Sequence, residues 1–123
     1  MKSQRGFTIV EVLVALSIMS LGMIGILALQ KAATSASGYS RRATEAAVLA
    51  EDRLEELRTL PITSVTDGSD TVDAAGTATD DGLFDRTWTL VTAGTTATIT
   101  VRVAWNEADG AHAITFRTLR YVE

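Results

Sequence analysis

The stretch that decides the fold is residues 7–29, FTIVEVLVALSIMSLGMIGILAL, which is apolar except for the carboxylate of Glu11. Residues 12–29 contain no charged side chain. A helix rises about 1.5 Å per residue, and roughly twenty residues cross the hydrocarbon core of a bilayer, so this stretch is long enough to span it. The sequence therefore predicts one membrane-spanning helix near the N-terminus.

Two basic residues, Lys2 and Arg5, precede the apolar stretch. Basic residues beside a span favour the cytoplasm, so we expect the N-terminus there and the rest of the chain beyond the membrane. A cleavable secretory signal is the alternative, because small residues follow the stretch at 32–36. The apolar core of such a signal is only about 7–15 residues long, which argues against it.

Glu11 is the residue of this stretch that requires an explanation. A charged side chain inside a bilayer costs at least about 2.5–3.5 kcal/mol and marks a functional site by default. The alternative is that Glu11 lies close enough to the interface for its carboxylate to reach water. Its position in the sequence does not decide between the two.

The remaining composition excludes several classes of protein. The chain has 123 residues, enough for one domain and too few for two well-buried ones. It contains no cysteine, and its single histidine, His112, leaves little for a metal site or a catalytic triad. The formal net charge of −4 argues against a nucleic-acid-binding surface. We therefore predict no enzyme, no cofactor, no metal site and no nucleic-acid partner.

Small and apolar residues at helical spacing predict an amphipathic helix over 31–60 that continues the apolar one. Its apolar face consists of Ala43, Ala46, Ala47, Ala50, Leu54 and Leu57. Pro61 cannot continue a helix, so we expect the last helical residue between Arg58 and Leu60.

The next segment, 61–82, is rich in Thr, Asp, Ala and Gly and predicts a solvated connecting loop. Its aspartates lack the alternate spacing of a helix-loop-helix calcium site, so a loop is favoured over a metal site. They are Asp67, Asp70, Asp73, Asp80 and Asp81.

Alternation over 83–123 predicts strands at 84–90, 97–105 and 113–122. In the last of these the apolar parity changes before Leu119, so the sequence does not decide whether Leu119 and Tyr121 share a face with Ile114 and Phe116; a bulge would reconcile them. Trp88 and Trp105 are predicted to lie in the core. His112 is predicted to be an exposed residue beside a turn.

The predicted fold class is α+β: a long N-terminal helix packed through its second half on a small antiparallel sheet of three or four strands.

Residues 5–16 resemble the class III signal of type IV pilins and type II secretion pseudopilins. In that pattern a short basic leader ends in Gly, Phe usually follows, and Glu stands five residues into the mature chain. Here those positions are Gly6, Phe7 and Glu11. The resemblance implies that a prepilin peptidase cleaves the leader, residues 1–6, between Gly6 and Phe7, and that the Phe7 amine is then methylated. It also implies a salt bridge from Glu11 to that amine of a neighbouring subunit, which fixes their register.

Residues 21–30 and 47–58 resemble minor pilins of the PilV type. The alternative is a GspI-type minor pseudopilin, which shares the leader, the short head and a strand like residues 86–88; a membrane-anchored enzyme or receptor domain is a remote third. The resemblance implies a filament-core helix over 7–30 and a single-pass inner-membrane protein with a periplasmic head that later enters a pilus or pseudopilus. Its implied partners are the prepilin peptidase, other minor and major pilins or pseudopilins, the inner-membrane assembly platform and, at a filament tip, an adhesin.

Overall fold

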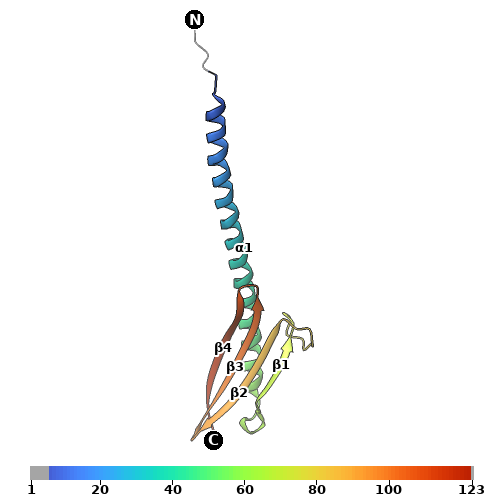
Figure 1. The fold of residues 1–123 in the computed structure, drawn as a ribbon. Coiled ribbons are helices and arrows are strands. Elements are labelled where there is room, and N and C mark those ends of the chain that lie inside the picture. The colour runs from blue at the N-terminus through green and yellow to red at the C-terminus, as the bar shows by residue number, and fades with distance from the viewer. Residues whose placement is uncertain (1–5, 123) are drawn as a thin grey trace. The chain divides into compact units, whose positions relative to one another are not determined.

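The computed structural model describes residues 6–122, so Lys2 and Arg5 of the leader lie outside the described residues. The elements follow in the order α1 (Ile9–Thr59), the 3-10 helix η1 (Ile62–Ser64), β1 (Gly68–Val72), β2 (Phe84–Ala93), β3 (Thr96–Glu107) and β4 (Gly110–Tyr121). One long N-terminal helix and a four-stranded antiparallel sheet make up the α+β fold that the sequence predicts (Figure 1).

The chain divides into two compact units that meet between Gly38 and Tyr39. In the first unit, every residue of α1 from Ile9 to Gly38 is exposed. By length and composition α1 can cross a membrane. The helix begins at Ile9, two residues later than the sequence predicts, and Thr8 accounts for the difference, as described below.

In the second unit, the part of α1 that begins at Tyr39 packs on the sheet. The predicted amphipathic face is confirmed, because Ala46, Ala50 and Leu57 are buried. The helix ends at Thr59, two residues before Pro61, as expected. The core cluster consists of Ala46, Leu49, Ala50, Leu57, Val65, Val72, Phe84, Ile99, Val101, Val103 and Trp105.

The strands follow one another across the sheet in chain order, β1-β2-β3-β4, with every neighbouring pair antiparallel (Figure 1). The β2–β3 turn is tight, since Ala93 pairs with Thr96, and Gly94 takes the positive φ of 59° that such a turn requires.

The last strand contains no bulge between Gly110 and Tyr121. β4 pairs residue for residue with β3 along its whole length, from Gly110 to Tyr121. Unbroken alternation therefore directs Leu119 and Tyr121 away from the core, and they are 71% and 84% exposed. The change of parity in the sequence arises because two apolar residues lie on the exposed face of β4.

The predicted loop over 61–82 contains η1 and a fourth strand, β1. β1 pairs with β2 from Gly68 opposite Trp88 to Val72 opposite Phe84. Of its five residues only Val72 is buried, so its sequence carries almost no apolar signal.

The two tryptophans and the histidine differ in burial. Trp105 is 2% exposed, as predicted, whereas Trp88 is half-buried at the margin of the core, with the Arg53 guanidinium 3.9 Å from its ring centre. His112 is also half-buried, with its ring 4.9 Å from that of Tyr39 and 5.6 Å from that of Trp105. The expectation that it is an exposed residue is therefore wrong.

Candidate functional site at the start of helix α1

The junction between Gly6 and Phe7 lies outside the helix. Gly6, Phe7 and Thr8 belong to no helix or strand, and Phe7 is 83% exposed. A Cβ placed on Gly6 would meet no atom within 4 Å. Exposed, non-helical backbone is where proteases cut most readily, so this junction is open to cleavage.

Thr8 caps the first turn of α1. Its carbonyl oxygen accepts hydrogen bonds from the N–H groups of Glu11 (3.1 Å) and Val12 (3.2 Å), and its hydroxyl oxygen accepts one from Glu11 (3.3 Å). A helix leaves its first N–H groups without partners, and a threonine side chain at this position satisfies one of them. We did not predict this role, although Thr8-x-x-Glu11 has the spacing of a capping box.

Glu11 lies in the first turn of α1, where the helix dipole favours a negative charge. Together with Gly6, Phe7 and Thr8 it lines one hollow. The structure thus brings all the predicted site residues to one place. Across residues 6–122, the salt bridges include no partner for the Glu11 carboxylate.

Three of the five aspartates of the 61–82 segment have structural partners. Arg86 donates to both carboxylate oxygens of Asp70, at 2.9 and 2.6 Å, from a site where Arg86 is only 8% exposed. Asp67 accepts a hydrogen bond from the Leu90 N–H at 2.7 Å. Asp73 accepts two from backbone N–H groups of its own turn. The acidic composition of this segment therefore serves to fix backbone and to bind a buried guanidinium.

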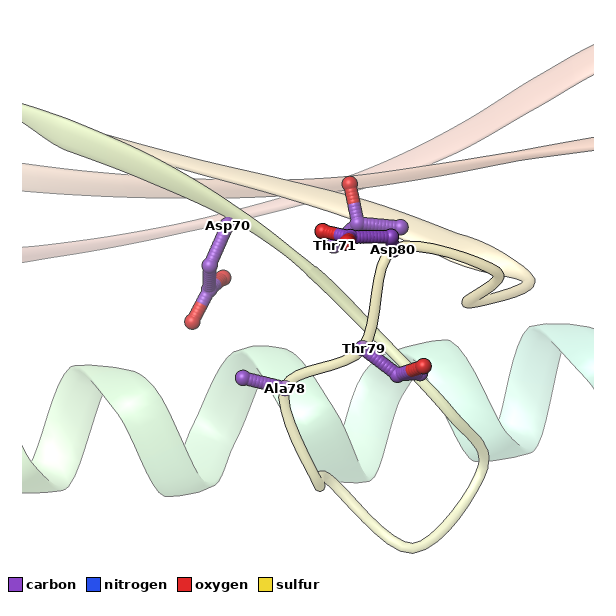
Figure 2. Close-up of a pocket in the computed structure, with 5 residues that line it drawn as sticks. All are labelled: Asp70, Thr71, Ala78, Thr79 and Asp80. Atoms are coloured by element: carbon purple, nitrogen blue, oxygen red, sulfur yellow. The ribbon is translucent and has the colours of Figure 1, made fainter.

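A hollow beside β1 is lined by Asp70, Thr71, Ala78, Thr79 and Asp80 (Figure 2). Asp70 points toward α1 in this view, and Arg86 takes up both of its oxygens. The hollow then offers one carboxylate, Asp80, and two hydroxyls. Calcium takes six to eight oxygen ligands, so backbone carbonyls and water would have to supply most of them, and these three side chains alone do not make a calcium site.

Glu107, Asp109 and His112 form a second polar cluster at the β3–β4 turn, with potential ligand atoms within 4.8 Å of one another. Glu107 accepts a hydrogen bond from the Trp105 indole at 3.1 Å. His112 Nε2 lies 3.2 Å from Asp109 Oδ1, and this hydrogen bond lowers the pKa of Asp109. Both carboxylates thus already have protein partners that stabilise the turn.

Residues 1–27 match the family model for the prokaryotic N-terminal methylation motif. The matched segment includes Gly6, Phe7, Glu11 and most of the apolar stretch. The chain matches no curated protein and no solved structure.

The chain thus carries the N-terminal methylation motif of prokaryotic type IV pilin-like proteins, and its long helix packed on a four-stranded antiparallel sheet is consistent with a pilin-like fold. The apolar helix fits a membrane anchor. Proteins that carry this motif are structural subunits, and the motif implies contact with a prepilin peptidase and with other pilins.

Proposed function

We propose that this chain is a minor pilin of the PilV type that inserts in the inner membrane, with its head in the periplasm, and helps to prime or cap type IV pilus assembly as part of a tip complex. The observation that carries this proposal is the methylation motif over residues 1–27, with its Gly6–Phe7 junction exposed ahead of α1. The proposed partners are the prepilin peptidase, other minor and major pilins, the assembly platform and a tip adhesin.

Cleavage between Gly6 and Phe7 would change the chemistry of this end of the chain. It removes Lys2 and Arg5, which leaves 9 basic against 15 acidic residues and a formal charge of −6. It also converts the uncharged amide nitrogen of Phe7 into a cationic amine, which is then methylated. The amine is the one new cation that cleavage produces.

Glu11 supplies the complement to that amine. Its carboxylate stands at the end of an otherwise apolar helix and lies in no salt bridge within residues 6–122. Pairing with the Phe7 amine of a neighbouring subunit offsets the cost of its burial among apolar helices. A slip along the filament axis would leave both charges unpaired, so the pair also fixes register.

Two sequence features support a minor rather than a major pilin. The chain has no cysteine, and therefore no C-terminal disulfide loop of the kind common in major pilins. Its only proline, Pro61, follows α1, whereas many major pilins have one within the first helix.

A GspI-type minor pseudopilin of type II secretion is the second candidate. The run Arg86-Thr87-Trp88 in β2 favours it, because such pseudopilins have a similar strand. Here Arg86 is buried against Asp70 and Trp88 lies at the core margin. These contacts would stabilise the head of a minor pilin and that of a minor pseudopilin equally well.

The experiment is deletion of the gene, with complementation by the wild-type chain or by the Gly6→Val variant, which should resist cleavage. Pili are counted by electron microscopy, and type II secretion is assayed in the same strains. We expect few pili, normal secretion and rescue by the wild-type chain alone. Normal pili with lost secretion would favour the pseudopilin, and no change in either would contradict both candidates.

A further inference from the structure

We propose that Thr8 is a positioning residue for leader cleavage. As the cap of α1 it fixes the helix start at Ile9, and it thereby keeps the Gly6–Phe7 bond in non-helical backbone that a peptidase can bind. This inference rests on the proposed function, because it concerns the same cleavage. Thr8 takes no part in the hydrolysis itself.

The hydrogen bonds of Thr8 distinguish it from the other hydroxyl residues of the apolar helix. Ser17 and Ser20 donate to the carbonyl oxygens four residues before them, at 2.8 and 2.7 Å, within the continuous helix. Thr8 accepts instead, through its hydroxyl and its carbonyl oxygen, from N–H groups of the first turn. The Thr8 side chain therefore caps the N-terminal end of the helix, whereas the two serine hydroxyls form hydrogen bonds inside it.

Loss of this cap would move the helix start toward the cleavage site. Without the hydroxyl the Glu11 N–H keeps only the Thr8 carbonyl as acceptor, at 3.1 Å, so the contribution of the cap to a helix start at Ile9 is lost. Extension of the helix toward Gly6 would exchange this i→i−3 bond for the ordinary helical bond to the Phe7 carbonyl, four residues earlier. Glycine is a tolerated cap, so Gly6 is the next residue at which the helix could begin. The Gly6–Phe7 bond would then belong to the first helical turn.

The expected kinetic signature follows from a change of population. If only chains with an extended junction bind the peptidase, a smaller extended fraction raises the apparent KM by the same factor. The kcat is unchanged, because chains that do bind present the same bond.

The test uses the full-length precursor in detergent micelles with a purified prepilin peptidase. Thr8→Ala removes the cap, Thr8→Ser retains the hydroxyl, and Thr8→Asn caps with an amide oxygen. Ser20→Ala is the control for loss of a hydroxyl elsewhere in the helix. Cleavage kinetics are measured beside the ¹³Cα chemical shifts of residues 6–9, which report where the helix begins.

For Thr8→Ala we expect a larger fraction of helix that includes Phe7 and a raised KM, by at most the roughly three- to tenfold that a cap contributes to the local equilibrium. Thr8→Ser, Thr8→Asn and Ser20→Ala should stay within about twofold of the wild type. The result for Thr8→Asn is the most informative of these. Asparagine supplies a capping oxygen but differs from threonine in shape, so normal cleavage kinetics would show that the cap itself is what matters.

Wild-type kinetics for Thr8→Ala would overturn the inference. A Thr8→Asn variant that is cleaved slowly although its helix still begins at Ile9 would also overturn it, because the peptidase would then recognise the hydroxyl directly. A wild-type chain that is not cut at Gly6–Phe7 would contradict the proposed function, and this inference with it. A cut wild-type chain with an equally fast Thr8→Ala variant contradicts the inference alone.

Discussion

Glu11 is the one charged residue in 7–29. The cost of inserting its carboxylate into a membrane can be compared with the stabilisation that the dipole of its own helix provides. Insertion of a carboxylate costs at least about 2.5–3.5 kcal/mol. The helix dipole stabilises a negative charge at the first turn by typically about 0.3–1 kcal/mol. The dipole therefore offsets a minor part of the cost, and in the proposed mechanism a cationic partner offsets the rest where the helix is surrounded by apolar groups.

We predict that Glu11→Ala separates assembly from membrane insertion. Removal of the charge makes insertion easier, so the variant should accumulate in the inner membrane at least as well as the wild type. Filament number should fall as far as in the deletion strain, because the neighbouring Phe7 amine is left buried and unpaired, at a cost of about 3–5 kcal/mol. Membrane-fraction blots and the yield of sheared filaments measure the two effects.

Two variants control this experiment. Glu51→Ala removes an exposed glutamate from the same helix and should change neither readout. Glu11→Gln keeps the shape without the charge and should fail like Glu11→Ala. If Glu11→Ala subunits are cleaved, reside in the membrane and support normal filament numbers, the carboxylate reaches water instead and the pairing mechanism is wrong.

Among the elements, β1 depends on the close approach of Gly68 to the Trp88 ring. A Cβ on Gly68 would lie 2.5 Å from Trp88 Cζ2. The ring cannot easily move, because its Nε1 donates to the Thr66 carbonyl at 3.0 Å and Arg53 lies over its face. Glycine at this position therefore lets the indole cover the first residue of the strand.

We predict that Gly68→Ala destabilises the head by about 1–3 kcal/mol, the usual cost of overpacking. In a Trp88→Ala background the same substitution should cost less than about 0.5 kcal/mol, because the clash is gone. Urea denaturation of the four proteins of this cycle measures the coupling. Ser69→Ala, at the exposed neighbouring position, should be neutral, and additive effects of Gly68→Ala and Trp88→Ala would show that the ring does not constrain Gly68.

The sequence predicts those elements whose signal is local. Helix α1 shows apolar spacing and a terminating proline, and β2 and β3 alternate clearly, so their positions follow from pattern alone. β1 does not, because long-range pairing with β2 and the Asp70–Arg86 ion pair determine it. The faces of β4 do not follow from its pattern, because Leu119 and Tyr121 are apolar but exposed.

The candidate site was predictable for a related reason. Gly6, Phe7 and Glu11 belong to a contiguous motif with fixed spacing, so no knowledge of the fold is needed to find them. Thr8 was missed as a cap because we read the segment as a membrane helix and not as a helix start. The proposed partner of Glu11 belongs to a second chain, which the sequence of one subunit does not contain.

At the scale of the whole molecule, the second unit contains all the buried core residues, from Ala46 to Trp105. The core therefore does not depend on the apolar half of α1. We predict that a head fragment beginning at residue 31 is soluble and folds on its own. Thermal unfolding followed by circular dichroism should show one cooperative transition, and Trp105→Ala should destabilise the fragment by about 3–5 kcal/mol. A fragment that aggregates or melts without a transition would show that the apolar helix is needed for folding.

The measurement that tests the central claim most directly is the intact mass of the native protein purified from membranes of cells that contain a prepilin peptidase. We expect a chain that begins at Phe7, lacks residues 1–6 and carries one additional methyl group on its N-terminal amine. In cells without the peptidase the same chain should begin at Met1. A Met1 start in peptidase-competent cells, or a cut at any bond other than Gly6–Phe7, would contradict the account.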